Sequence, residues 1–222
     1  RDFCLSRGLG DVYKRQWPYL IALIGTALAC LIPGWHVPAG IFFLLAAFVA
    51  FFFRDPVRTI PADPLAAVSP ADGTVLRIEP IENEEFIGGP ATRVSIFLSV
   101  FNVHINRSPI AGVVRLRKFR EGKMLPAYKS HASEENERNT IGIEGKAGRV
   151  LVHQITGLIA RRIVCRVDTG DELAKGQRYG LIKFGSCTEL IVPASAEVLV
   201  REGDKVTGGE TILARLKAPE DQ

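Results

Sequence analysis

The chain has 222 residues, enough for one or two domains with a buried core. Its formal net charge is +4 and its pI is about 9.0, a mild excess that suits an anionic membrane surface. The basic residues form no long run and no aromatic–basic platform, which disfavours nucleic acid as a partner. The 4 cysteines are scattered without a C-x-x-C pair, which argues against a zinc site or a disulfide framework and favours a reducing compartment.

Residues 1–16 have no initiator Met and no clear periodicity. We interpret them as a leader that is non-native or disordered, and we leave them out of the fold prediction.

The next segment, residues 17–53, contains no Asp, Glu, Lys or Arg. Two apolar stretches, 18–33 and 38–53, are split by Pro and Gly, which predicts a helical hairpin. Each stretch would form about 24 Å of helix, less than the bilayer core of about 30 Å, so the hairpin would recruit flanking residues to span or would dip in from one side. Arg54 and Arg58 follow, so we expect a membrane-associated hairpin at the inner membrane, with the remaining chain on the cytoplasmic face. The alternative is a helical pair buried in a soluble core.

After Arg54, Gly and Pro punctuate short apolar runs every eight to fifteen residues, which predicts a β-rich domain over residues 54–222. The expected class is mainly β (α+β), a compact barrel or sandwich. The first expected unit is a turn at Asp72-Gly73 between short apolar runs of residues 67–78. Further strands are expected at 93–103, 113–119, 148–154, 163–167, 180–184, 188–192 and 211–216, and helices at 130–139 and 157–162.

Two segments, residues 167–176 and 200–209, share the pattern Val-x-x-Gly-Asp-x-φ-x-x-Gly, where φ is apolar. This pattern suits a strand, a tight turn that needs glycine, and a second strand. It is typical of biotinyl and lipoyl-like barrels, so we expect lipoyl-like repeats in the β-rich domain.

Three places carry residues that could do chemistry: Asp72 in Ser-Pro-Ala-Asp-Gly, His104, and the Gly185-Ser186 step. If they meet, the histidine takes the serine proton and the carboxylate orients the histidine. Each alone is ordinary, because Asp-Gly and Gly-Ser occur in turns and a single histidine is usually a core or surface group. An Asp-His-Ser hydrolase with an intact chain and a non-catalytic, membrane-anchored lipoyl-like module therefore both stay open.

Five segments occur in a fixed order and together carry a resemblance. They are Phe-Arg-Asp-Pro-Val-Arg-Thr-Ile-Pro (53–61), Ser-Pro-Ala-Asp-Gly (69–73), Asn-Val-His-Ile-Asn-Arg-Ser-Pro (102–109), Ala-Ser-Glu-Glu-Asn-Glu-Arg-Asn (132–139) and Arg-Tyr-Gly-Leu-Ile-Lys-Phe-Gly-Ser (178–186). With them, residues 17–216 resemble the phosphatidylserine decarboxylase family, in the short bacterial and archaeal form of this pyruvoyl-dependent proenzyme.

The resemblance implies that the chain cuts itself between Gly185 and Ser186, with His104 and Asp72 assisting, and that a covalent pyruvoyl group is made from Ser186. It implies decarboxylation of phosphatidylserine to phosphatidylethanolamine and CO₂, without a metal. The implied partners are phosphatidylserine, membrane lipid, and the large and small chains of one precursor, residues 1–185 and 186–222. A homodimer is left open.

The chain departs from the family pattern at two positions. Cys187 follows the Gly-Ser step, where many relatives carry Ser, Thr or Arg, and Arg107 stands where longer members carry a second histidine. His153, inside an expected strand, is interpreted as a surface residue. Candidates to contact a lipid phosphate, or alternatively to pair with neighbouring glutamates, are Arg107, Arg138 and Lys183.

Overall fold

The structure is a computed structural model that describes residues 10–123, 125, 135–157, 162–182 and 186–217. The chain divides into two compact units, Arg1–Pro56 and Val57–Gln222.

The first unit contains two helices, α2 (Gly10–Leu31) and α3 (His36–Phe52), as the apolar stretches predict. Helix α2 begins before the boundary expected at Trp17, so the described part of the expected leader is helical. Small side chains allow helices to approach closely. Small residues buried in this unit are Ala27, Ala39 and Ala46.

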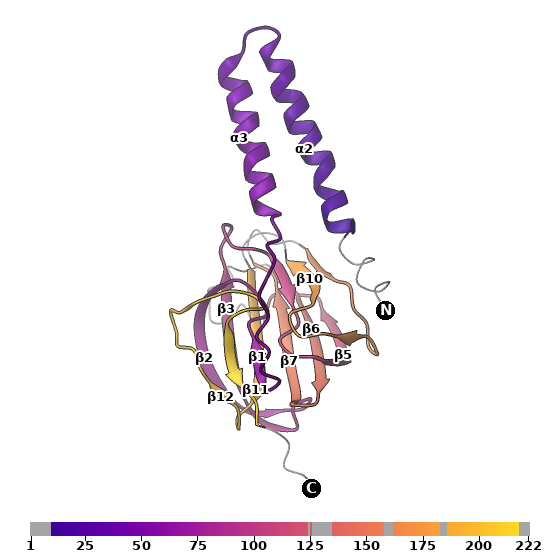
Figure 1. Cartoon of the computed structure of the whole chain (residues 1–222), viewed down its shortest axis with the longest axis vertical. Helices are drawn as coiled ribbons and strands as arrows, with labels where there is room; N and C mark the ends of the chain where they lie inside the picture. The colour runs from indigo at the N-terminus through magenta and orange to yellow at the C-terminus, as the bar shows by residue number, and fades with distance from the viewer. Residues whose placement is uncertain (1–9, 124, 126–134, 158–161, 183–185, 218–222) are drawn as a thin grey trace. The chain divides into compact units, whose positions relative to one another are not determined.

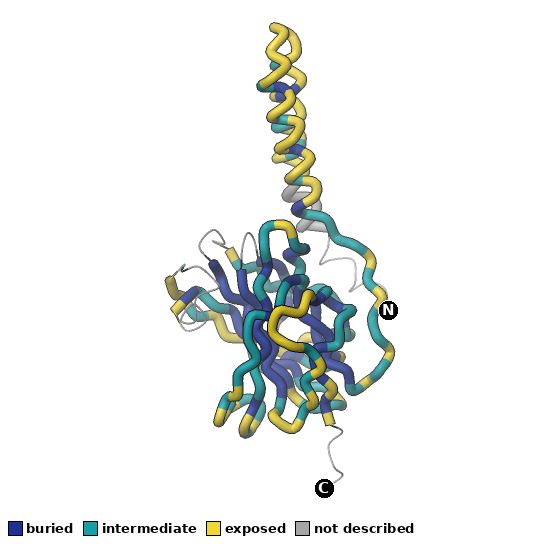
Figure 2. The backbone as a smooth tube through the Cα atoms, turned by 90° about the vertical axis from the view of Figure 1, so that its left-hand side faces the viewer, coloured by how far each residue is buried: buried dark blue, intermediate teal, exposed yellow. Residues whose placement is uncertain are grey.

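Most of the surface of both helices is exposed (Figure 2). The large apolar side chains exposed there are Trp17, Tyr19, Ile21, Ile24, Leu28, Leu31, Ile32, Trp35, Val37, Ile41, Phe43, Leu44, Leu45, Phe48 and Phe51. Within the described part of the chain, neither helix combines the length and the apolar character needed to cross a membrane.

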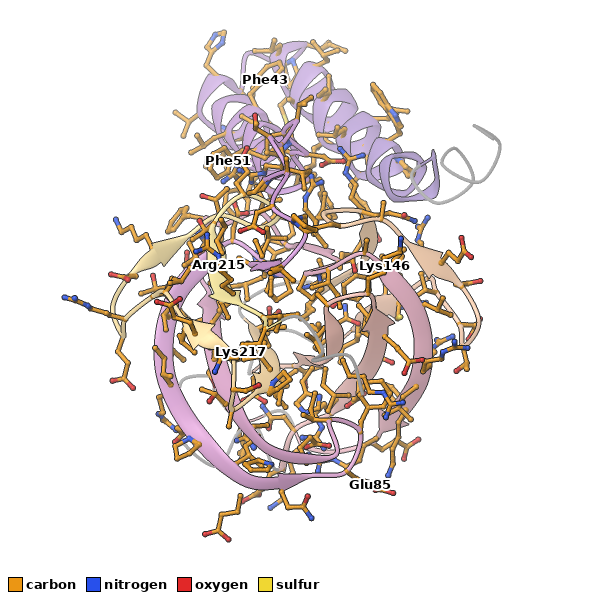
Figure 3. All side chains as sticks on the ribbon, turned by 60° about the horizontal axis from the view of Figure 1, so that its bottom comes forward. Phe43, Phe51, Glu85, Lys146, Arg215 and Lys217 are labelled. Carbon is orange, nitrogen blue, oxygen red and sulfur yellow. The ribbon has the colours of Figure 1, made fainter. Side chains whose placement is uncertain are left out.

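The second unit is built on a curled sheet of eight strands in the order β13-β2-β3-β11-β7-β6-β5-β9, in which all neighbours are antiparallel (Figure 1). Its strands are β2 (Gly73–Glu84), β3 (Gly89–Leu98), β5 (Gly112–Arg120), β6 (Arg138–Gly145), β7 (Gly148–Ile155), β9 (Glu172–Leu173), β11 (Ser186–Pro193) and β13 (Lys205–Val206). Figure 3 shows the curl, with Glu85 in the turn between β2 and β3.

Two smaller sheets complete the unit, with strand orders β1-β14-β12 and β4-β10-β8. Their strands are β1 (Ala66–Val68), β4 (Ile105–Arg107), β8 (Ile163–Cys165), β10 (Arg178–Ile182), β12 (Glu197–Val198) and β14 (Ile212–Arg215). The unit is therefore mainly β, as expected from the punctuated apolar runs.

Strand β11 lies in the middle of the large sheet, between β3 and β7. Successive side chains of a strand point to opposite faces. Leu190 and Val192 belong to the main hydrophobic cluster, and the face that carries them is called the core face. Cys187, Glu189 and Ile191 lie on the other face, called the opposite face. Phe86 covers part of the opposite face, because its ring lies where a side chain on Gly142 would project.

The unit contains an internal repeat that relates residues 65–75 to residues 104–114. Both segments contain Ser-Pro-x-x-Gly, and they cross with reciprocal bonds: the N–H of Val68 donates to Pro109 and the N–H of Arg107 donates to Pro70, both at 2.9 Å. The repeat continues in the two Val-x-x-Gly-Asp segments that the sequence analysis singled out.

These two glycine segments make matching contacts at opposite ends of the large sheet. Gly170 donates to Val114 and Gly203 donates to Val75, both at 2.8 Å. Val114 and Val75 donate back to the aspartates that follow those glycines, both at 2.9 Å. The predicted strand–turn–strand repeats are therefore present as edge strands, β9 and β13.

Three local expectations were wrong or lie outside the described residues. The runs around Asp72-Gly73 do not form a hairpin, because β1 and β2 belong to different sheets. Gly73 is required by close packing instead, since a side chain there would overlap the carbonyl oxygen of Phe97. A helix was expected at 130–139, but residues 138 and 139 belong to strand β6, whose alternate residues pack into the core. Residues 130–134 are not described. The helix expected at 157–162 falls mainly on undescribed residues.

Candidate functional site

Ser186 is the first residue of β11 and is fully buried. Its backbone pairs with Leu98 of β3. Its Oγ is shielded from solvent and makes no hydrogen bond to any residue that the structure describes. A buried hydroxyl with no partner among the described residues costs free energy and calls for an explanation. Gly185 and Lys183, which the sequence analysis also singled out, lie outside the described residues.

His104 lies immediately before β4 and is 4% exposed. Its carbonyl oxygen accepts a hydrogen bond from the N–H of Ile182, the last residue of β10, at 3.2 Å. Strand β10 therefore ends beside His104, and the chain reaches Ser186 four residues further on.

The strands that carry His104 and Ser186 are joined by a side-chain hydrogen bond. The Nδ2 of Asn106 in β4 donates to the Oγ1 of Thr188 in β11 at 3.1 Å. Asn106 follows His104 by two residues, and Thr188 follows Ser186 by two residues. Together with the backbone bond between Ile182 and His104, this bond puts residues His104 and Ser186 at the same end of the two strands.

Asp72 has different partners from those expected. Its two carboxylate oxygens accept bonds from the Nη2 of Arg58 at 3.0 and 2.8 Å, and Oδ1 also accepts from the N–H of Gly208 at 2.8 Å. The side chains of Arg58 and Asp72 are only 11% and 16% exposed. The described bonds of Asp72 thus tie it to the segment that follows the helical unit and to a glycine turn, and do not include His104.

Arg107 is 6% exposed, and its Nη1 donates to the carbonyl oxygen of Gly176 at 3.2 Å. Its side chain also lies against Gly209, the equivalent glycine of the second repeat. This burial favours a role within the fold over the lipid contact expected from the sequence.

Arg138 is the first residue of β6, on the opposite face of the sheet and at the same end as Ser186. It pairs directly with Arg120 across the strands. Burial, together with Arg120, lowers the pKa of Arg138. Like charges facing each other across a sheet are unfavourable, and Glu189 and Glu84 offset part of this repulsion at Arg138.

Two further side chains lie on the opposite face, one on β7 and one on β11. His153 is 5% exposed, so its interpretation as a surface residue was wrong; it lies on the central strand β7. Its Nδ1 is 2.9 Å from the Oγ1 of Thr140, and burial and the nearby arginines hold its pKa well below 6.5. Burial, and secondarily Glu189, raise the pKa of the Cys187 thiol well above its usual value.

Polar side chains that were not among the predicted site residues line the core face beside Ser186. Thr188, Gln154 and Asn106 are all fully buried and bonded to one another. A signal was available, because Asn106 follows His104 at the two-residue spacing that places strand residues on one face. Among the described residues there is no cluster of His, Cys, Asp and Glu that could hold a metal ion.

Comparison with known proteins shows which family this chain resembles. Residues 45–214 match the family model described as phosphatidylserine decarboxylase. A phosphatidylserine decarboxylase proenzyme of Carboxydothermus hydrogenoformans is 53% identical over 208 residues, covering 93% of this chain and 97% of that protein. The proenzymes of Symbiobacterium thermophilum and Magnetococcus marinus are 49% and 41% identical, covering 92% and 95% of this chain and 95% and 98% of their own lengths.

Proposed function

Because the chain belongs to the phosphatidylserine decarboxylase family, we propose that it is a proenzyme that cuts itself at Gly185-Ser186 and then decarboxylates phosphatidylserine to phosphatidylethanolamine. The observation that carries this proposal is the buried Ser186 hydroxyl, which bonds to no described residue, at the end of β11 where His104 also lies. The printed names of the relatives, proenzymes of this decarboxylase, agree with it.

The cut begins when the Oγ of Ser186 attacks the carbonyl carbon of Gly185 and the amide becomes an ester, with the freed amine taking a proton. His104 is the proposed base for the hydroxyl proton. Removal of the Cα proton of Ser186 then expels the Gly185 carboxylate and leaves dehydroalanine. Water replaces the nitrogen of that residue, which leaves as ammonia, and the small chain begins with a pyruvoyl group.

The site suits this conversion because Ser186 can change without disturbing a hydrogen-bond network. Its Oγ makes no bond to a described residue, so its loss leaves no described partner unsatisfied. The small chain stays bound, because β11 is held by β3 on one side and by β7 on the other. A pyruvoyl group at this position supplies the carbonyl that takes up the substrate amine and accepts the electron pair released with CO₂. His104 is the proposed acid that returns a proton to the substrate carbon.

Contacts with the lipid are also proposals. Arg138, paired with Arg120, offers a fork of N–H donors for the lipid phosphate, and Lys183 stays a candidate outside the described residues. The exposed apolar side chains of α2 and α3 exceed what a soluble surface usually carries, which supports lipid as their partner. We place the hairpin in the inner membrane and the β-rich unit on the cytoplasmic face, from the basic residues that follow the hairpin.

The test is the intact mass of the purified chain. We expect two fragments, with the small one lacking the Ser186 nitrogen, and an uncut, inactive Ser186→Ala variant. A single chain with serine intact in fully active material would contradict the proposal and favour a hydrolase. Retention of both fragments on one column under native conditions, and their separation in denaturant, would test whether β11 holds the small chain.

A further inference from the structure

A chain of buried amides crosses the core face beside the candidate site. Asn139 Nδ2 donates to Gln154 Oε1 at 2.8 Å, Gln154 Nε2 donates to Asn106 Oδ1 at 2.8 Å, and Asn106 Nδ2 donates to Thr188 Oγ1 at 3.1 Å. All four side chains are at most 2% exposed. These three amides and one threonine link β6, β7, β4 and β11. His104 precedes β4, and Ser186 begins β11.

The direction of these bonds is fixed by the groups available. Gln154 and Asn106 each use the side-chain oxygen toward one neighbour and the nitrogen toward the next, so neither can flip without losing two bonds. Gly180 leaves the room for this path, because a side chain there would come within 2.9 Å of Gln154 Nε2. A fully satisfied buried network of this kind rigidifies the strands that it joins.

The internal repeat shows that the fold does not require polar residues at these positions. The counterpart of Asn106 in the other repeat is Ala67, which is fully buried, and the counterpart of His104 is Leu65. An apolar residue therefore satisfies the same backbone position between the same kinds of strand. Burying an amide where alanine suffices calls for a reason outside folding.

We propose that Asn106 is a positioning residue: by bonding Thr188, it holds the strand next to His104 in register with the strand that begins at Ser186. The inference rests on the self-processing proposed above and adds a residue that the reaction depends on without touching the reacting atoms. Small displacements of reacting groups cost large factors in rate, about 100-fold for 1 Å. Loss of the bond between Asn106 and Thr188 is therefore expected to lower the rate of self-processing strongly while changing the unfolding temperature little.

The experiment follows self-processing of the full chain by intact mass at intervals after synthesis, with thermal unfolding measured on the same samples. Thr188→Val removes the acceptor of Asn106 and keeps the side-chain shape. Its matched control is Thr140→Val, which also removes one side-chain bond from a buried threonine of the same sheet, on the opposite face. We expect Thr188→Val to process at least about ten-fold more slowly than the control at a similar unfolding temperature.

Asn106→Asp is the conservative variant. Its carboxylate keeps the shape and can accept from both Gln154 and the rotated hydroxyl of Thr188, so it retains the link that Thr188→Val breaks. We therefore expect Asn106→Asp to process faster than Thr188→Val.

Equal processing rates in Thr188→Val and Thr140→Val, or a folded Asn106→Asp variant that processes no faster than Thr188→Val, would overturn the inference while leaving the proposed function intact. A wild-type chain that is never cut would overturn the proposed function, and this inference with it. The two failures are distinguished by the wild-type mass alone.

Discussion

The bond between Arg58 and Asp72 can be tested by a double-mutant cycle. Asp72→Asn keeps an acceptor for Gly208 but removes the charge that Arg58 faces at 2.8 Å, and Arg58→Met keeps most of the aliphatic stem. Because both side chains are mostly buried, each single change should lower the free energy of unfolding by about 2 kcal/mol, the range for charge-assisted bonds. Glu210, 3.6 Å from Arg58, retains part of the interaction.

The cycle is best measured in the Ser186→Ala background, so that processing does not change the molecule under study. Unfolding by guanidinium in detergent micelles, followed by circular dichroism, gives the four free energies. We expect the double variant to lose little more than either single variant, with a coupling energy of about 1.5 kcal/mol or more. A coupling below about 0.5 kcal/mol would refute the ion pair as a structural link.

The same variants separate two roles for Asp72 in processing. If Asp72 acts through Arg58, then Arg58→Met in the Ser186-containing chain slows processing by a factor similar to that of Asp72→Asn. If Asp72 instead orients His104 directly, Asp72→Asn should slow processing by several orders of magnitude while Arg58→Met has little effect. From the described bonds we expect the first result.

Three further outcomes follow from buried groups. The pKa of His153 is lowered in the folded chain, so its contribution to stability is complete above pH 6.5. As the pH falls below that value, the free energy of unfolding should drop by up to about 1.4 kcal/mol per pH unit. A His153→Gln variant, compared with the wild type by unfolding at pH 7.5 and 5.5, should lack this pH-dependent loss. The Cys187 thiol should resist iodoacetamide at pH 8 in the folded chain and react only after unfolding, and rapid labelling of the folded chain would show that the thiol is not buried. Gly73→Ala should destabilise the β-rich unit by about 3 kcal/mol or more, because the added methyl group would overlap the Phe97 carbonyl, whereas Gly25→Ala, with no atom within 4 Å, should not destabilise the chain.

Local patterns were sufficient to predict most elements of the fold. The strands expected at 113–119, 148–154 and 188–192 correspond to β5, β7 and β11, because apolar residues and glycines mark their centres and ends. The two glycine repeats were also predicted, since a positive φ at Gly170 and Gly203 leaves a signature in the sequence.

Sheet membership could not be predicted, because it depends on contacts between distant segments. The Asp72-Gly73 dipeptide has the composition of a hairpin turn, yet its flanking strands pair with β14 on one side and with β3 and β13 on the other. The glycine is needed for close packing against β3, which no local pattern reveals. For the same reason the sequence placed Asp72 with His104, whereas the described bonds give it Arg58 and Gly208.

The internal repeat explains where the site lies in this fold. Aligning residues 65–75 with residues 104–114 sets five polar side chains against apolar counterparts. The pairs are His104 with Leu65, Asn106 with Ala67, Arg107 with Val68, Asp72 with Ala111, and Thr74 with Val113. Two copies of one structural unit thus satisfy the same backbone bonds, and the polar residues appear where the copies differ. The backbone bonds are the same in both copies although one carries Asn106 and the other Ala67, so those bonds do not require the amide. This is the ground on which we assign Asn106 a positioning role.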